Sequence, residues 1–220
     1  MTTDAPMKPR VGRPRRDEVG DVSARILAAA TALFLEKGVA ATSCEAVAAR
    51  ARVSKVSLYA RHSGKDALFA AVVRHAVGGT IPAPKVTAMS GGTVRDRLHQ
   101  IGRAVLIHAL APVPRELMRL FLTEARRSPD LIAHVDGMAR VGVVAMVSDA
   151  ILTPAHDPAL RDIADALAER FLDLTFAPII LAALTGRHAD QTVEEIDIRI
   201  AQALDLLEHT GLLANLAPNP

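Results

Sequence analysis

Apolar residues recur every three or four positions over most of this chain, and this spacing is typical of amphipathic helices. The first such run covers residues 22–34, between Asp21 as a candidate N-cap and Gly38 as a candidate C-terminal stop. No segment shows the apolar–polar alternation of a half-buried strand. The pattern therefore predicts an all-α fold of about nine helices.

Residues 38–69 predict two short helices joined by a tight turn, followed by the start of a third helix. Thr42 with Glu45 three residues later fits a capping box that opens the first short helix. Ser54 is a suitable N-cap for the second. Val53, in the turn, is apolar and is expected to close the corner between them. This is the arrangement of a helix-turn-helix.

The second short helix, residues 54–60, carries mostly small, polar or cationic side chains and the only tyrosine of the protein. Such a helix can enter a major groove of DNA and meet base edges and phosphates together. We expect Tyr59 and Lys65 mainly on phosphates, and Val56 and Ser57 at base edges. The full set of predicted DNA-contacting residues is Arg13, Arg15, Thr42, Ser43, Lys55, Val56, Ser57, Tyr59, Arg61, His62 and Lys65.

Within residues 21–75 a set of positions follows a recognisable pattern: Arg25, Ile26, Leu27, Ala29, Ala30, Leu33, Phe34, Gly38, Thr42, Ser43, Val47, Ala48, Ala51, Val53, Ser54, Lys55, Leu58, Tyr59, Lys65, Leu68 and Phe69. Through these residues, and over this span without a gap, the chain resembles the TetR family of bacterial transcription regulators. The resemblance implies a dimeric, DNA-binding repressor that a ligand releases from DNA.

Three positions depart from the family pattern. Arg52 stands in the inter-helix turn, where the family usually has glycine, and a left-handed conformation there would cost a non-glycine residue about 1–2 kcal/mol. Val56 replaces a frequent glycine and offers a surface for a thymine methyl. His62 replaces a usual phenylalanine. These departures bear on base preference and on local rigidity, and leave the predicted fold unchanged.

Charge is unevenly distributed although the formal net charge is only +2. Residues 1–75 carry 13 Lys and Arg against 7 Asp and Glu, a net charge of +6; residues 76–220 carry 13 against 17, a net charge of −4. The basic part is the part with the helix-turn-helix, as a phosphate-binding surface requires. The acidic part is not expected to touch DNA.

No apolar run is long enough to cross a membrane, and the N-terminus lacks a signal sequence, so we expect a cytoplasmic protein with no membrane partner. The single cysteine, Cys44, excludes an internal disulfide and suits a reducing compartment. It is interpreted as a small buried hydrophobe in preference to a redox sensor.

Residues 1–20 contain three prolines, two glycines and little apolar periodicity, and predict a disordered basic arm. Within it, residues 10–16 place arginines around a Gly-Arg-Pro core and resemble an AT-hook, which lies in a narrow minor groove. The alternative is a solvated tail that adds only non-specific affinity. The predicted domains are this arm, a DNA-binding domain over 21–80, and a ligand-binding and dimerisation domain over 81–220.

The C-terminal part predicts long apolar helices separated by proline-containing breaks. Their expected spans are 94–109, 114–127, 129–151, 158–184 and 192–213. The last two carry wide apolar stripes that are either internal core or a homodimer interface, which the family resemblance favours. The stripes consist of Leu167, Phe171, Leu174, Ile179 and Leu181, and of Ile196, Ile200, Ala203, Leu204 and Leu207.

A looser resemblance of residues 116–131 to the efflux-repressor subset of the family implies a ligand pocket in this helical bundle. The expected effector is a small, mostly apolar molecule. Met and Phe at helical spacing are also typical of plain core, and that alternative remains beside the ligand hypothesis. The predicted ligand-contacting residues are His108, Met118, Phe121, Met138 and Phe171.

Other functional classes find little support in the sequence. The eight histidines include no pair at metal-ligand spacing, so neither a metal nor another cofactor is expected. There is no phosphate-binding glycine loop, nucleophile elbow or carboxylate–histidine cluster, so an enzyme is not expected. The remaining alternative to a ligand-responsive repressor is an architectural DNA-binding protein without an effector. A closed bundle core would favour the architectural protein, and an enclosed pocket would favour the regulator.

Overall fold

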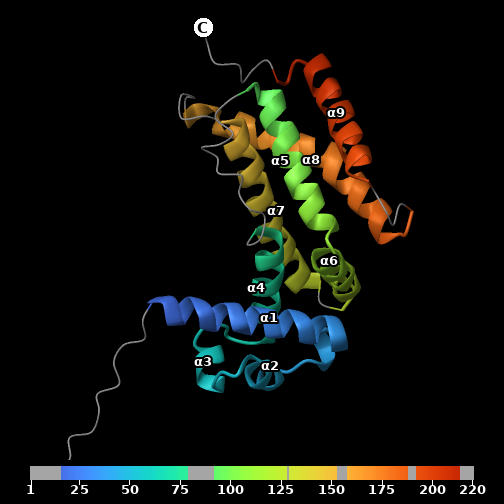
Figure 1. Ribbon diagram of the computed structural model, residues 1–220. Coiled ribbons are helices and arrows are strands. Elements are labelled where there is room, and N and C mark those ends of the chain that lie inside the picture. The colour runs from blue at the N-terminus through green and yellow to red at the C-terminus, as the bar shows by residue number, and fades with distance from the viewer. Residues whose placement is uncertain (1–15, 79–91, 128, 153–157, 188–191, 214–220) are drawn as a thin grey trace, which may run out of the picture. The chain divides into compact units, whose positions relative to one another are not determined.

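The computed structural model describes residues 16–78, 92–127, 129–152, 158–187 and 192–213 of the chain (Figure 1). These residues form nine α-helices and one short 3-10 helix, η2 (Pro158–Leu160), and none of them lies in a strand. The all-α prediction is confirmed. No helix among them is long and apolar enough to span a lipid bilayer. The chain divides into two compact units, Met1–Leu68 and Phe69–Pro220.

The first unit is a small bundle around one apolar core. Its fully buried side chains include Ile26, Phe34, Val47 and Leu58, one or more from each of its first three helices. Cys44 is also buried and free, as its interpretation as a small hydrophobe predicted. The helices of this unit are α1 (Arg16–Ala41), α2 (Cys44–Ala51), α3 (Lys55–Tyr59) and the first turn of α4 (Lys65–Gly78).

The first helix begins earlier than the sequence predicted. α1 starts at Arg16, so Asp21 lies inside it and is not its N-cap. At the other end, the expected stop at Gly38 is confirmed by its backbone, with φ 81° and ψ 165°.

The predicted capping box at Thr42 is wrong by one residue. Ser43 is the N-cap of α2, and its Oγ accepts a hydrogen bond from the backbone N–H of Ala46 at 3.1 Å. The Thr42 hydroxyl instead donates to the carbonyl of Gly38 at 2.8 Å and lies 3.2 Å from that of Leu33. Thr42 therefore ties the end of α1 to the start of α2.

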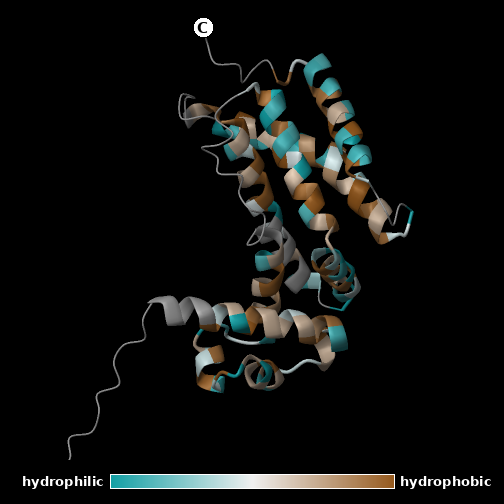
Figure 2. Cartoon of the chain, viewed as in Figure 1, coloured by the Kyte–Doolittle hydropathy of each residue, from teal (hydrophilic) through white to brown (hydrophobic). Residues whose placement is uncertain are grey.

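In the second unit, α5 is central and packs against the four helices that follow it (Figure 1). α9 carries both hydrophilic and hydrophobic residues, as a helix with one buried face requires (Figure 2). Capping boxes open α9 at Thr192 and α5 at Thr93. The helices are α5 (Val94–Leu110), α6 (Pro112–Ala125), α7 (Pro129–Ile151), α8 (Arg161–Leu184) and α9 (Val193–His209).

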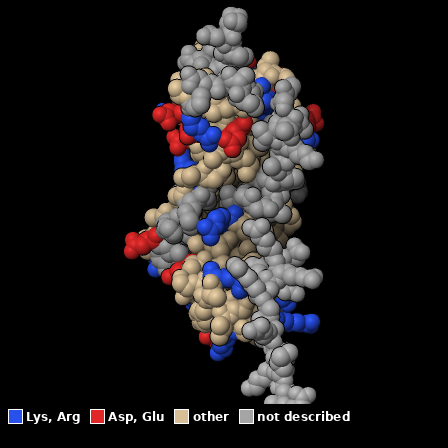
Figure 3. Space-filling view, turned by 90° about the vertical axis from the view of Figure 1, so that its left-hand side faces the viewer, with Lys and Arg blue, Asp and Glu red and all other residues tan. Residues whose placement is uncertain are grey.

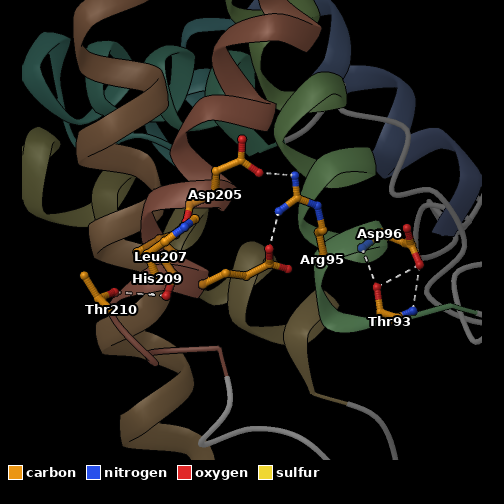
Figure 4. A network of polar contacts seen from close by, with 8 residues as sticks. Thr93, Arg95, Asp96, Asp205, Leu207, His209 and Thr210 are labelled. Atoms are coloured by element: carbon orange, nitrogen blue, oxygen red, sulfur yellow. Dashed lines mark hydrogen bonds and ion pairs between the residues drawn. The ribbon is translucent and has the colours of Figure 1, made fainter.

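Two arginines near the start of α5 stabilise this bundle in different ways. Arg95 forms exposed ion pairs with Asp205 and Glu208 of α9, at 2.6 and 2.7 Å (Figure 4). Arg97 is buried and donates from Nε to the carbonyl of Ala150 and from Nη2 to that of Ile151, at 2.7 and 2.8 Å. Arg97 thus satisfies carbonyls at the end of α7 that have no partner within their own helix.

Candidate DNA-binding surface and ligand pocket

The short helix α3 is held by its cap and by one apolar anchor. Ser54 Oγ accepts a hydrogen bond from the backbone N–H of Ser57 at 3.0 Å, as the sequence predicted. Leu58 is fully buried beneath the helix. Val56 and Tyr59 stand on the surface, with 79% and 46% of their area exposed. α3 therefore presents a methyl-bearing and a phenolic side chain to the surroundings.

The turn between α2 and α3 carries local backbone strain at Arg52. Its φ of 54° and ψ of 47° place it in the left-handed region, and it is the only non-glycine residue with positive φ among the described residues. Its N–H bonds to the carbonyl of Ala49, and that of Val53 bonds to Ala48. The turn thus adopts the conformation that glycine favours, with an exposed arginine in its place.

Glu45, at the start of α2, lies beside two of the predicted DNA-contacting side chains. Its Oε1 accepts a hydrogen bond from the Tyr59 hydroxyl at 3.3 Å and lies 3.9 Å from Lys55 Nζ. The backbone N–H of Glu45 and the charge of Lys55 hold the pKa of this carboxyl below its ordinary value. The same carboxylate raises the pKa of Tyr59. At neutral pH the contact therefore joins an ionised Glu45 to a protonated Tyr59.

Two further cationic side chains of the predicted set fold back onto the protein. Arg61 Nη1 donates to the carbonyl and to Oγ of Ser57, at 2.8 and 2.9 Å. Lys65 Nζ donates to the carbonyl of Ala40 at 3.1 Å. His62 is half-buried at the end of the segment that follows α3. Arg61 and Ser57 therefore act as one hydrogen-bonded pair on α3.

The predicted DNA set is only partly brought together. Lys55, Val56, Ser57, Tyr59 and Arg61 share α3 or its immediate end, and Ser43 is exposed at the start of α2. Thr42 is only 4% exposed, so its expected place on the DNA surface is wrong: its hydroxyl is used within the fold. Arg13 and Arg15 lie outside the described residues. The sequence did not predict that Glu45 contacts Tyr59 and Lys55. Its position three residues after Thr42 indicated only a capping role.

Basic groups predominate on the surface of this first unit. On the face that Figure 3 shows, Lys and Arg atoms are more prominent than Asp and Glu atoms over this unit. The exposed or half-buried cations include Arg50, Arg52, Lys55 and Arg61. A surface of this kind attracts phosphates at long range.

The second unit contains an apolar cavity of about 250 Å³. Helices α4 to α8 all contribute to its wall. The largest apolar side chains that line it are Leu117, Met118, Phe121, Leu172 and Phe176. A mostly apolar concave wall with few polar groups is typical of small-molecule sites.

Three polar side chains also line the cavity: His108, Arg140 and Asp173. His108 Nε2 lies 2.5 Å from the carbonyl oxygen of Ala76 in α4. A carbonyl oxygen can only accept, so Nε2 carries the proton, and a neutral His108 has its lone pair on Nδ1. Arg140 is half-exposed and lies 3.6 Å from Asp173 and 3.8 Å from Glu169. The basic charge at the wall is therefore already balanced by carboxylates.

The predicted ligand residues divide into three groups. His108, Met118 and Phe121 line the cavity. Phe171 does not: it is fully buried in the core, where its ring meets Gly102 of α5. Met138 lies in α7, and its side chain is outside the described part of the chain. On α8, Leu172 and Phe176 line the cavity instead. They are four residues apart, and this i, i+4 spacing is the sequence signal that could have indicated the cavity-facing side of α8.

Comparison with known proteins agrees with this architecture. A sequence profile of bacterial regulatory proteins, tetR family, matches residues 26–72. The HTH-type transcriptional repressor Rv3405c of Mycobacterium tuberculosis is 32% identical over 193 residues, covering 83% of this chain and 90% of that protein. The chain belongs to the TetR family. It is therefore a DNA-binding transcriptional regulator, as the sequence predicted.

Solved structures of other TetR-family regulators share the fold. A putative regulator from Mesorhizobium loti, 18% identical, covers 90% of this chain and 98% of its own, with a TM-score of 0.64. The flavonoid-responsive regulator FrrA is 27% identical and covers 86% of this chain and 97% of its own, with a TM-score of 0.59. Within this TetR-family chain, the α2–turn–α3 segment with its left-handed Arg52 lies inside the part that the family profile matches.

Proposed function

We propose that this TetR-family protein is a repressor that binds a palindromic operator as a homodimer and is released by a small, mostly apolar ligand. The observation that carries the proposal is the cavity in the second unit, because a closed bundle would have favoured an architectural protein without an effector. The relative named as a repressor adds support for repression. Acting on chromosomal DNA, the protein would work in the cytoplasm.

For DNA recognition, we assign α3 to the major groove. Val56 would meet thymine methyls and Ser57 neighbouring base edges, while Lys55, Tyr59 and Lys65 would bind phosphates. Two copies of α3 must reach grooves about 34–36 Å apart, which requires a dimer. Lys55→Ala should weaken binding to all sequences, whereas Val56→Ala should change the preferred base at one position of each half-site.

For dimerisation, we assign an apolar face of α8 and one of α9. Leu181 is 63% exposed and shares a face of α8 with exposed Ala177 and Pro178. On α9, Ile198 and Leu206 are about half-exposed and lie on one side. These residues differ from the α9 stripe expected from the sequence. All members of that stripe are buried within this chain, which supports the alternative that the stripe is internal core: Ile196, Ile200, Ala203, Leu204 and Leu207.

For the ligand, the cavity wall favours an uncharged, mostly apolar molecule with one or more hydroxyl groups. A carboxylate ligand would have to displace Asp173 from Arg140, whereas a ligand hydroxyl could donate to Nδ1 of His108, because Nε2 carries the proton that the carbonyl of Ala76 accepts. The structural relative FrrA is named as flavonoid-responsive, and because flavonoids are polyphenols this name supports the phenolic class. Flavonoids and simpler phenols are therefore the first compounds to try.

For release, we assign the coupling to α4. Val73 and Ala76 of this helix line the cavity, and His108 is bonded to the carbonyl of Ala76. α4 is one continuous helix whose first turn, from Lys65, belongs to the DNA-binding unit. A ligand that pushes on its last turns can change the separation of the two copies of α3. A preference of a few kcal/mol for the released state is enough to shift most of the population.

The test fills the cavity without touching the DNA surface. Met118→Trp places a large side chain in the cavity, and Leu122→Trp, on the exposed side of the same helix, is the matched control. Fluorescence anisotropy measures release from a DNA duplex selected by the wild-type protein, and thermal shift measures phenol binding. We expect only Met118→Trp to lose both responses. If phenols stabilise the protein but leave operator affinity unchanged, the proposed coupling is refuted. If phenols neither stabilise the protein nor release it from the operator, the proposed ligand class is refuted.

A further inference from the structure

Glu45 holds the side chains that α3 would offer to phosphates. Its carboxylate accepts the hydroxyl proton of Tyr59 at 3.3 Å and faces the Lys55 ammonium at 3.9 Å. Both contacts cross from α2 to α3, so they link the two helices of the helix-turn-helix. The side chains of Glu45 and Lys55 are 48% and 66% exposed, so solvent and DNA can reach them.

The phenol of Tyr59 has one proton to donate. A phosphate at neutral pH offers only acceptor oxygens, so Tyr59 cannot donate to Glu45 and to a phosphate at the same time. Lys55 has three protons, but a phosphate that pairs with it meets the negative charge of Glu45 nearby. Close docking of α3 on a DNA backbone therefore requires these contacts to be broken or weakened.

We propose that Glu45 is an intramolecular competitor of the operator phosphates that holds operator affinity below its maximum. The proposal rests on the placement of α3 on DNA proposed above. Loose, non-specific complexes depend on long-range attraction to phosphates and do not require the Tyr59 hydroxyl to change partner. The operator complex, in which α3 docks closely, does require it. Removing Glu45 should therefore strengthen operator binding more than non-specific binding.

Glu36 supplies a matched control for the charge change. It is a carboxylate of the same unit with the same 48% exposure, and it pairs at 2.7 Å with Arg50, so this contact joins α1 to α2 and involves no residue of α3. Glu36→Gln and Glu45→Gln alter the net charge equally, but only the second acts on Tyr59 and Lys55. Glu45→Ala also removes the acceptor, and so should have the larger effect of the two changes at position 45.

The experiment measures the affinity of the full-length protein for two duplexes at several salt concentrations. One duplex is selected from random sequence by the wild-type protein, and the other is a scrambled duplex of the same length and composition. We expect Glu45→Ala to strengthen operator binding about two- to fivefold. Glu36→Gln should change binding to both duplexes by a smaller, equal factor. Equal gains from the two variants would reduce Glu45 to a contributor of net charge and would overturn the proposal.

Tyr59→Phe separates this proposal from the one on which it rests. In the Tyr59→Phe background the hydroxyl is absent, so the gain from Glu45→Ala should fall, and a gain that stays undiminished would show that Glu45 does not act through Tyr59. Should Tyr59→Phe and Lys55→Ala both leave operator affinity unchanged, the placement of α3 on DNA is wrong. Weakened binding in those variants, together with no gain from Glu45→Ala, refutes the competitor alone.

Discussion

Arg97 and Arg95 lie two positions apart on α5, and replacing each by methionine should have very different consequences. Arg95 has two carboxylate partners on α9 and is partly exposed. Among the described residues, the hydrogen-bond partners of Arg97 are the carbonyls of Ala150, Ile151 and Gly92, at 2.7 to 2.8 Å. Burial lowers the pKa of the Arg97 guanidinium, which reflects the cost of taking its charge out of water. We predict that Arg97, which bonds to carbonyls, stabilises the fold more than Arg95, which pairs with carboxylates.

The expected magnitudes follow from burial. Arg97→Met removes three charge-assisted hydrogen bonds, each worth about 1.5–3 kcal/mol. It leaves the carbonyls of Ala150 and Ile151 without a partner at the end of α7, and part of the loss is offset because no charge is buried any longer. A net loss of about 2–4 kcal/mol in the free energy of unfolding results. Arg95→Met breaks exposed pairs and should cost no more than about 1 kcal/mol.

Urea unfolding followed by far-UV circular dichroism, at one fixed protein concentration, measures both variants. Arg97→Lys keeps the charge but loses the planar fork, so its transition midpoint should fall between those of the wild type and Arg97→Met. The reasoning is refuted if Arg95→Met shifts the midpoint as much as Arg97→Met does. It is also refuted if Arg97→Lys matches the wild type, because charge alone would then account for the effect.

Four further changes test other parts of the structure. Arg52→Gly should stabilise the protein by about 0.5–1 kcal/mol in thermal unfolding, because relief of the left-handed strain exceeds the entropy that glycine adds to the unfolded chain. Arg52→Ala, which keeps a Cβ at this position, should give no gain in stability. Gly102→Val should destabilise by about 2–3 kcal/mol, since a Cβ there would lie 2.5 Å from Phe171 Cζ, and Phe171→Leu should recover part of the loss. Leu181→Glu should convert the dimer to monomers in light scattering and abolish operator binding. Lys65→Ala should reduce the salt slope of DNA binding by about 1, and an unchanged slope would remove Lys65 from the phosphate contacts.

The sequence predicted the DNA-binding unit well because its signals are local. The cap at Ser54 and the stop at Gly38 each depend on a few neighbouring residues, and the structure confirms both. Thr42 was misplaced because its hydroxyl finds partners nine and four residues back along the chain, which cap spacing does not reveal. Glu45 was missed as a partner of Tyr59 for the same reason, since their contact spans fourteen residues.

The second unit was harder to predict because apolar residues in a bundle have several possible neighbours. Phe171 and Phe176 are both aromatic residues of α8, but five positions apart they point to different sides: Phe171 into the core and Phe176 into the cavity. Periodicity identifies the helix, but it does not say which side faces a cavity. The apolar stripe of α9 is likewise buried in a helix that packs against α5 and α8. Ile198 and Leu206 are exposed on the same helix, but two residues are too few to form a recognisable pattern in the sequence.

Helix α3, which we propose enters the major groove, has only five residues, with Leu58 as its buried anchor. A helix of this length does not persist in water by itself, because nucleation costs more than one turn of hydrogen bonds returns. Packing against the neighbouring helices therefore keeps α3 helical, and α3 can unfold locally while the rest of the chain remains native. Amide hydrogens of α3 should then exchange by local opening, well before those of α1. If α3 binds DNA as proposed, heating or a small change near Leu58 can abolish DNA binding by this regulator. The far-UV circular dichroism spectrum would still be that of a folded protein.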